Sequence, residues 1–270
     1  MGLAKKGTLK VVSPRGSELE KALFNQFNIF HSRDCFPIKE VEKIILKERQ
    51  HDVYLMDNKP KRPPENLLIF SPSGASKCNR ELIFNANKEK KIEERYPYQR
   101  RWTRNSTAVH EVTQSDLLYM THLMKKPDFK VKFLENGLPA WEKNLKTYKV
   151  FKHNGVEFSI LGMMDGILTY KDGTDIGFEF KTKTNSVAQV GNYKMKEPAL
   201  YHKQQCVCYS LLFGMDEFVL MYEAVAKDGW NKNGEARTDI RTFYYKVDEK
   251  DRTLLLDKYA QVVKDFEAMK

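Results

Sequence analysis

The chain has 270 residues, of which 41% are hydrophobic, 12% aromatic and 30% charged. This supply of large apolar side chains is typical of a packed core and excludes a disordered tail protein. With 46 Lys and Arg residues against 36 Asp and Glu residues, the formal charge is +10, which favours a polyanionic partner, nucleic acid before an anionic membrane surface.

Three further features concern the cellular location. No stretch approaches the roughly 20 apolar residues that span a bilayer, and no apolar run follows Lys5 and Lys6 as it does in a secretory signal. The four cysteines include no Cys-x-x-Cys pair, and we interpret them as reduced thiols. We therefore expect an intracellular, cytoplasmic protein without a membrane segment.

The N-terminal part of the chain carries two helical patterns and a linker. Apolar residues recur at helical spacing over Ser17 to Phe30 and again over Pro37 to Gln50. Three prolines within five positions then make Asp57 to Pro64 an extended linker. We predict a helical extension with a Pro-rich linker over residues 1–66 and a second domain over residues 67–270.

The second domain begins with helices and continues with strands. We expect helices over residues 75–86, 106–124 and 139–146, and a loop rich in charges and rings over residues 95–104. Asn154-Gly155 predicts a hairpin between strands at 148–152 and 156–160. Further strands are expected at 162–170, 176–182, 217–225 and 238–247, and helices at 199–213 and 252–269. This order predicts an α/β fold with a central mixed sheet flanked by helices.

The chemically informative segment runs from Gly162 to Lys183. We place Asp165 near the middle of one strand and Glu179 and Lys181 in the next, with a short turn between. Since residues two apart in a strand share a face, two carboxylates and a lysine then converge. Carboxylates are ligands for Mg²⁺ or Mn²⁺, and a nearby lysine neutralises charge on a phosphate. The alternative is an ordinary half-exposed strand, with Phe178 and Phe180 in the core and the charges in water.

More motifs agree with the catalytic interpretation. Asp165 with Glu179-Phe180-Lys181 resembles the signature of the PD-(D/E)xK nucleases, which share a restriction-endonuclease-like core. Gln205-Cys-Val-Cys-Tyr209 is similar to the Gln-x-x-x-Tyr motif of the RecB-type exonuclease branch. The segment from Ser71 to Arg80 resembles the opening of such domains. The resemblance covers about residues 67–248.

The resemblance implies a role for each matching residue. His110, Asp165, Glu179 and the Phe180 carbonyl bind Mg²⁺ or Mn²⁺, and Lys181 is the catalytic lysine. Gln205 and Tyr209 belong to the catalytic set, face the DNA backbone and steady the site. Their spacing of four independently places both on one helical face.

The sequence also departs from the family pattern. Ser106 stands where a glycine is usual, and Asn79 where a proline is common. Many relatives hold an iron–sulfur cluster through one upstream and three downstream cysteines. Cys78 fits the upstream place, but no cysteine follows Tyr209, so we expect no cluster. This resembles the cluster-free branch, which includes mitochondrial genome maintenance exonuclease and phage exonucleases, and it suggests a phage-encoded protein in a bacterial host.

Basic and aromatic side chains supply candidate nucleic-acid contacts. Arginines and rings alternate between residues 95 and 104, where arginines neutralise phosphates and rings stack on unpaired bases. A structural loop with buried rings is the alternative. The residues that we assign to nucleic-acid binding are Arg80, Arg100, Arg101, Trp102, Arg104 and Lys183.

These observations favour a divalent-metal-dependent DNA exonuclease that acts on single-stranded or end-frayed DNA. A structure-specific endonuclease on the same fold and a catalytically inactive nucleic-acid-binding scaffold remain open. A membrane-surface protein ranks last, since no strongly basic amphipathic helix is present. Three roles remain open for residues 1–66: they bind a protein partner, cap the channel that holds the nucleic acid, or mediate assembly.

Overall fold

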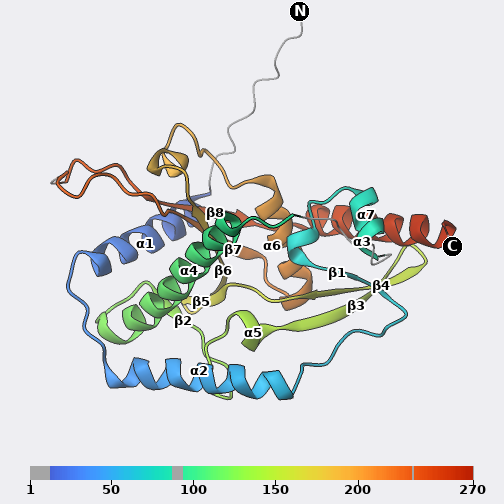
Figure 1. Cartoon of the computed structure of the whole chain (residues 1–270), viewed down its shortest axis with the longest axis horizontal. Helices are drawn as coiled ribbons and strands as arrows, with labels where there is room; N and C mark the ends of the chain where they lie inside the picture. The colour runs from blue at the N-terminus through green and yellow to red at the C-terminus, as the bar shows by residue number, and fades with distance from the viewer. Residues whose placement is uncertain (1–12, 87–93, 233, 270) are drawn as a thin grey trace, which may run out of the picture.

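The computed structural model describes residues 13–86, 94–232 and 234–269. Residues 1–12 of the predicted extension and residues 87–93, 233 and 270 of the predicted second domain lie outside the described residues. Figure 1 shows the elements in chain order. The helices are α1 (Pro14–His31), α2 (Lys39–Asp57), α3 (Asn79–Ala86), α4 (Pro97–Leu123), α5 (Glu142–Leu145), α6 (Leu200–Phe213) and α7 (Glu249–Ala268), with 3-10 turns η1 (Pro72–Gly74) and η2 (Val187–Val190).

The described strands form two sheets. The strands are β1 (Leu68–Phe70), β2 (Phe129–Val131), β3 (Thr147–His153), β4 (Val156–Gly162), β5 (Gly166–Tyr170), β6 (Asp175–Lys183), β7 (Glu217–Ala224) and β8 (Ile240–Lys246). The larger sheet has the order β2-β5-β6-β7-β8 and the smaller one β1-β4-β3. The β1–β4 and β6–β7 pairs are parallel and the others antiparallel. The predicted α/β class is confirmed, but two mixed sheets replace one.

Strand β7 shows why helices cover both faces of the larger sheet. Phe218, Leu220 and Tyr222 lie in one core with residues of α6 and α7. Val219 and Met221 lie in a second core with residues of α1 and α4. Both faces are therefore buried, which explains the continuous apolar run of this strand.

Helix α1 packs on the larger sheet as part of that second core. Pro14 occupies the first turn, and the Ser13 side chain accepts a hydrogen bond from the Gly16 N–H at 3.0 Å, which caps the helix. The side chains of Leu19, Leu23 and Phe27 recur every four residues and are buried. The predicted boundary after residue 66 stays a prediction, but this helix of the extension shares its core with the sheet.

The predicted β3–β4 hairpin is confirmed. Both central residues of its turn have positive φ, 47° at Asn154 and 82° at Gly155. This conformation matches the right-handed twist of the flanking strands and explains the Asn-Gly sequence. The pairing runs without interruption from His153↔Val156 to Thr147↔Gly162.

The predicted loop over residues 95–104 is wrong, because α4 begins at Pro97. The proline fixes a helical φ and lacks only an N–H that a first turn leaves unpaired. Gln99 closes the turn, since its Oε1 accepts a hydrogen bond from the Tyr96 N–H at 2.9 Å. The rings of Tyr98 and Trp102 are 55% and 47% exposed, so the alternative of buried rings is also wrong.

Other elements also differ from the predictions. The strand predicted over 162–170 begins only at Gly166, so Asp165 lies just outside it. The helix predicted over 139–146 is confined to α5. The short strand β2 was not predicted, because three residues give too brief a pattern to recognise. In the described part of the chain, no helix is both long enough and apolar enough to cross a membrane.

We predict that Gln26 anchors α1 to the edge strand β2. Its buried amide donates to the Phe129 carbonyl and accepts from the Phe129 N–H, both at 2.8 Å. Gln26→Ala leaves both buried backbone groups unpaired, so the free energy of unfolding should fall by about 2 kcal/mol or more, as measured by urea denaturation. The exposed Asn25→Ala on the same helix is the control, and equal stabilities of the two variants would contradict the anchor.

Candidate active site

The candidate site lies where strand β5 leaves strand β6. The β5–β6 ladder ends at the pair Gly166↔Phe178, so β6 has no β5 partner from Glu179 onward. Asp165 pairs with this free edge of β6, since its Oδ2 accepts a hydrogen bond from the Phe180 N–H at 2.9 Å. The carboxylate of Asp165 thus replaces the next ladder partner and is brought beside Glu179 and Lys181.

Glu179 is buried on the face of β6 that looks toward α6. Its exposed fraction is 0%, whereas the Lys181 side chain remains 25% exposed. The Lys181 ammonium contacts Glu179 Oε1 as an ion pair and lies 3.7 Å from Asp165 Oδ2. Within the described residues, neither oxygen of Glu179 accepts a well-formed hydrogen bond. The interpretation of this strand as an ordinary half-exposed one is therefore wrong for Glu179.

Helix α4 holds Asp165 through two side chains one turn apart. His110 Nε2 lies 3.5 Å from Asp165 Oδ2, and Gln114 Nε2 donates to the Asp165 carbonyl at 3.1 Å. The His110 ring also lies against the Phe180 ring, with centroids 5.6 Å apart. The helix therefore fixes both the side chain and the backbone of Asp165. Gln114 was not predicted as a site residue, although its spacing of four from His110 is a usable signal.

Glu142 completes the surroundings of His110 and was also missed by the sequence analysis. Its Oε1 lies 3.1 Å from His110 Nδ1, and its N–H donates to the Met164 carbonyl at 2.7 Å. It has a positive φ of 41°, which side-chain-bearing residues adopt only where the surroundings enforce it. No local pattern marks such a residue in sequence.

The charges of the cluster shift one another's pKa values. Burial raises the pKa of Glu179, and the Asp165 carboxylate adds to it, so that it reaches about 7 despite Lys181. Burial also raises the pKa of Asp165, but Lys181 and His110 outweigh it and lower the value to about 2. Burial lowers the pKa of His110, yet Asp165 and Glu142 raise it to about 10. Burial opposes the charge of Lys181, but Glu179 and Asp165 raise its pKa.

Gln205 and Tyr209 lie together on α6, as their spacing predicts. Gln205 Nε2 donates to the Tyr209 hydroxyl at 2.6 Å. Tyr209 is only 1% exposed, so the expectation that it faces the DNA backbone is wrong for its side chain. The ring packs in the core with Phe218 instead, and the Gln205–Tyr209 pair approaches Glu179 from the interior. Helix α6 supplies this buried cover because its apolar residues face both sheets.

The predicted nucleic-acid residues lie outside this cluster. Arg100, Arg101, Trp102 and Arg104 are exposed on the first turns of α4. Lys183 continues the Glu179–Lys181 face of β6 and lies over the Tyr222 ring at 5.6 Å. Arg80 is exposed on α3, over the Phe84 ring at 5.4 Å.

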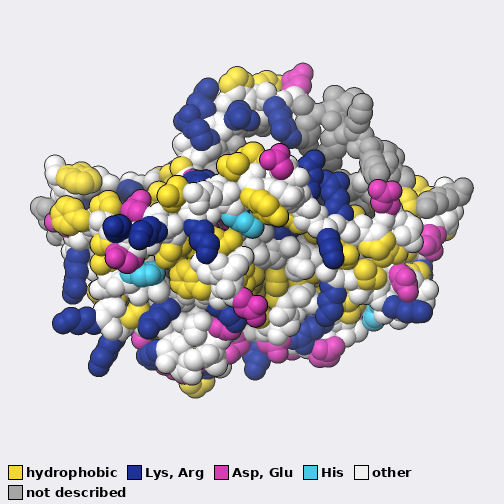
Figure 2. Space-filling view, turned by 90° about the horizontal axis from the view of Figure 1, so that it is seen from below, with side chains coloured by type: hydrophobic (Ala, Val, Ile, Leu, Met, Phe, Trp, Pro, Cys, Tyr) yellow, Lys and Arg dark blue, Asp and Glu magenta, His cyan; other side chains and the backbone are white. Residues whose placement is uncertain are grey.

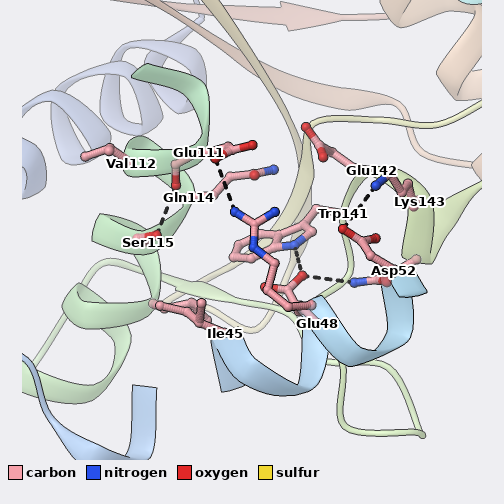
Figure 3. A pocket seen from close by; sticks show the side chains of 13 residues that line it. Ile45, Glu48, Asp52, Glu111, Val112, Gln114, Ser115, Trp141, Glu142 and Lys143 are labelled. Atoms are coloured by element: carbon pink, nitrogen blue, oxygen red, sulfur yellow. Dashed lines mark hydrogen bonds and ion pairs between the residues drawn. The ribbon is translucent and has the colours of Figure 1, made fainter. Parts of the chain in front are cut away.

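A cavity of about 240 Å³ lies beside His110, between α2, α4 and α5. Figure 3 shows Glu48, Asp52, Glu111 and Glu142 around it. Arg49 forms an ion pair with Glu111 at 3.2 Å, and Lys143 forms one with Asp52 at 3.0 Å. Glu48 accepts hydrogen bonds from Trp141 at 2.5 Å and Asn144 at 3.2 Å. The carboxylates that line the cavity outnumber the cations that line it, so this cavity does not attract phosphate.

The donor types at the site suit a hard divalent cation. The Asp165 and Glu179 carboxylates offer oxygen, and His110 offers nitrogen. Apart from the Lys181 ion pair, no described residue gives the buried Glu179 oxygens a well-formed hydrogen bond. Among the described residues, no three His, Cys, Asp or Glu side chains are already grouped as cation ligands. The Lys181 ammonium instead contacts Glu179, so it is the counter-charge of the carboxylates.

Comparisons with known proteins give distant structural likenesses. No family model and no curated protein sequence matches the chain. The crystal structure of an alkaline exonuclease (LHK-Exo) from Laribacter hongkongensis has 11% identity and a TM-score of 0.45, covering 75% of this chain and 90% of that one. A phage-related exonuclease from Haemophilus somnus 129PT has 15% identity and a TM-score of 0.34, covering 69% and 81%.

The crystal structure of SSO0001 has 15% identity and a TM-score of 0.43, and the match covers 84% of this chain and 87% of that one. Identities and scores this low carry no functional argument. The function has to be argued from the chemistry of the site.

We predict that the buried charge of Glu179 makes stability depend on pH in metal-free buffer. The pKa of Glu179 is about 7 in the folded protein, which is higher than in the unfolded chain. The protonated carboxyl group therefore contributes stability at a pH below its unfolded pKa. This contribution is lost as the pH rises through 7. From pH 4 to pH 8, Glu179→Gln should therefore gain stability relative to wild type, by about 1–3 kcal/mol in urea denaturation with EDTA.

The control for this pH series is the exposed Glu157→Gln on β4. If the stability difference between Glu179→Gln and wild type does not change over this pH range, the Glu179 carboxyl is not titrating as a buried group.

Proposed function

We propose that this protein is a divalent-metal-dependent deoxyribonuclease of the PD-(D/E)xK type that hydrolyses phosphodiester bonds. The observation that carries the proposal is the fully buried Glu179, ion-paired to Lys181 and placed beside Asp165 at an open strand edge. A buried carboxylate is costly unless a cation compensates it. A structural protein has no need of this grouping, whereas phosphodiester hydrolysis uses each member of it.

Each residue of the cluster has a role in the proposal. Asp165, Glu179, His110 and the Phe180 carbonyl hold Mg²⁺ or Mn²⁺, which polarises the phosphate and acidifies a water molecule when bound. His110 gives up its proton when it becomes a ligand. Gln114 and Glu142 orient Asp165 and His110.

Lys181 serves as the catalytic lysine, because its ammonium is the partly exposed cation next to both carboxylates. There it orients the attacking water and neutralises charge that develops on the phosphate. The Gln205–Tyr209 pair steadies Glu179 from the core side. No cysteine follows Tyr209 in the sequence, and we propose no iron–sulfur cluster.

The first turns of α4 are the proposed DNA-binding surface. Tyr98 and Trp102 are one helical turn apart and line an open groove with Ser106. Thr182, which lies between Lys181 and Lys183 on β6, donates a hydrogen bond to the Ser106 hydroxyl at 3.0 Å. The groove therefore leads to the catalytic strand. Figure 2, a view from below, shows Lys and Arg side chains spread over the underside of the molecule, with hydrophobic and acidic ones between them.

Rings and arginines together favour a single-stranded or end-frayed substrate. The faces of bases are free to stack on Trp102 only when they are unpaired. Arg100, Arg101 and Arg104 neutralise phosphates without regard to sequence. This is the basis for an exonuclease rather than a sequence-specific endonuclease.

We predict that Glu179→Ala and Lys181→Ala each reduce cleavage of end-labelled single-stranded DNA by roughly 100-fold or more, because the first removes a proposed metal ligand and the second removes the cation that neutralises charge developing on the phosphate. Product formation is measured with Mg²⁺, with Mn²⁺ and with EDTA. The controls are Glu157→Ala and Lys152→Ala, a Glu–Lys pair on the β3–β4 hairpin that is exposed and distant from the cluster.

Cleavage that persists in EDTA or in both site variants would contradict the proposed mechanism. Absence of cleavage by wild type with DNA binding retained would favour the inactive scaffold. A circular single strand distinguishes the two kinds of nuclease, because an exonuclease needs an end and leaves the circle intact.

We predict that Trp102→Ala weakens the binding of single-stranded DNA by about 1–3 kcal/mol, the cost of losing a stacked base, with little change in the salt dependence. Fluorescence anisotropy in EDTA measures the affinity. The control is Trp230→Ala, since Trp230 is 99% exposed on the β7–β8 loop. Equal effects of the two substitutions would argue against a specific stacking role for Trp102.

A further inference from the structure

We propose that the Pro-rich linker forms a second binding site for single-stranded DNA, next to the catalytic cluster. The inference rests on the proposed nuclease function and assigns a role to a segment that this function leaves unused. The site is a cavity of about 520 Å³ between the linker, the end of α2, β1, the end of β4 and α5. We call it the linker pocket, and its cations and apolar side chains are Lys59, Lys61, Arg62, Lys143, Lys146, Leu55, Met56, Ile69, Leu161 and Met163.

The rim of the linker pocket carries uncompensated positive charge. Lys59, Lys61, Arg62 and Lys146 are exposed, and none of them forms an ion pair with a described residue. Lys143 pairs with Asp52 at 3.0 Å, and among the described residues Asp52 is the only carboxylate that lines the pocket. A concave surface with this excess of cations attracts a polyanion. The acidic cavity of Figure 3, on the other side of the Asp52–Lys143 pair, repels one.

The floor of the linker pocket is apolar and open. Met56 is 70% exposed, Ile69 49% and Met163 44%. Apolar side chains gathered in a cavity with a cationic rim match a single strand, whose bases are hydrophobic on their faces and whose phosphates are charged. A duplex keeps its base faces stacked inside and cannot use such a floor. The chemistry of the pocket thus selects an unpaired strand.

Prolines hold the linker cations in place. Pro60 and Pro63 line the pocket, and Pro64 follows directly. A proline ring fixes φ and stiffens an extended chain. Lys61 and Arg62 therefore sit between fixed points, and less conformational entropy is lost when they bind a phosphate.

The linker pocket adjoins the catalytic cluster along two segments of the chain. Met163 in the floor is two residues from Asp165, which is at most about 7 Å of extended chain. Lys143 on the rim directly follows Glu142, which contacts His110. When the scissile phosphate of a single DNA strand lies at Asp165, the neighbouring nucleotides of that strand therefore reach the linker pocket. The linker pocket and the groove on α4 are two separate contacts with one strand.

The test is binding of labelled oligothymidylate to the full chain in EDTA, followed by fluorescence anisotropy over a salt series. We expect Lys59→Ala/Lys61→Ala/Arg62→Ala to weaken binding at least tenfold at low salt. The slope of log K against log salt should fall by about 2, since each phosphate contact on a single strand contributes roughly 0.7. The matched control is Lys125→Ala/Lys126→Ala/Lys130→Ala, which removes equal charge near the end of α4, far from the linker in Figure 1.

A second variant tests the apolar floor independently of charge. Ile69→Ser should weaken binding severalfold with an unchanged salt slope, whereas Val150→Ser should leave the affinity as it is. Val150 is the matched control because it is 42% exposed on β3, a strand of the same sheet, and does not line the linker pocket.

Three outcomes would overturn the linker pocket. One is equal loss of affinity in the linker and control triple variants, and another is an oligothymidylate affinity that neither linker nor floor variants change. The third is displacement of the oligonucleotide by polyglutamate as well as by unlabelled DNA, which would indicate a general polyanion surface. Because binding is measured without metal, failure of wild type to cleave DNA would count against the proposed function alone.

Discussion

The burial of Glu179 beside Lys181 is the constraint on which the rest of this structure depends. A carboxylate with an exposed fraction of 0% is strongly destabilising unless opposite charge is held next to it. Lys181 supplies that charge, the departure of β5 leaves room for Asp165 beside it, and α6 seals the side away from solvent. The packing of the fold therefore holds the charges of the candidate site close together.

Helix α4 joins this cluster to the molecular surface. Its 27 residues correspond to a rod about 40 Å long. One part of the rod holds Asp165 through His110 and Gln114, and the first turns display Trp102 and the arginines. A single rigid element thus fixes the distance between the groove at Trp102 and the cluster at Asp165, which is the arrangement that the proposed function needs.

The N-terminal region packs against the elements that form the candidate site. Helix α1 closes the edge of the larger sheet through Gln26, and α2 walls the cavity beside His110 with Glu48 and Asp52. The linker then returns the chain to β1, which pairs in parallel with β4 just before the strand reaches the site. The extension and the strands of the candidate site are therefore coupled by packing and not only by sequence.

The sequence by itself determined the elements whose signals are local. Helical spacing marks α1, α6 and α7, Asn154-Gly155 marks the hairpin, and the two-residue period puts Glu179 and Lys181 on one face of β6. Tertiary structure alone decided the burial of Glu179, the exit of Asp165 from β5, and the contacts of Gln114 and Glu142. These depend on chain segments tens of residues apart, and a local pattern carries no information about which segment will cover a strand face or where a ladder will end.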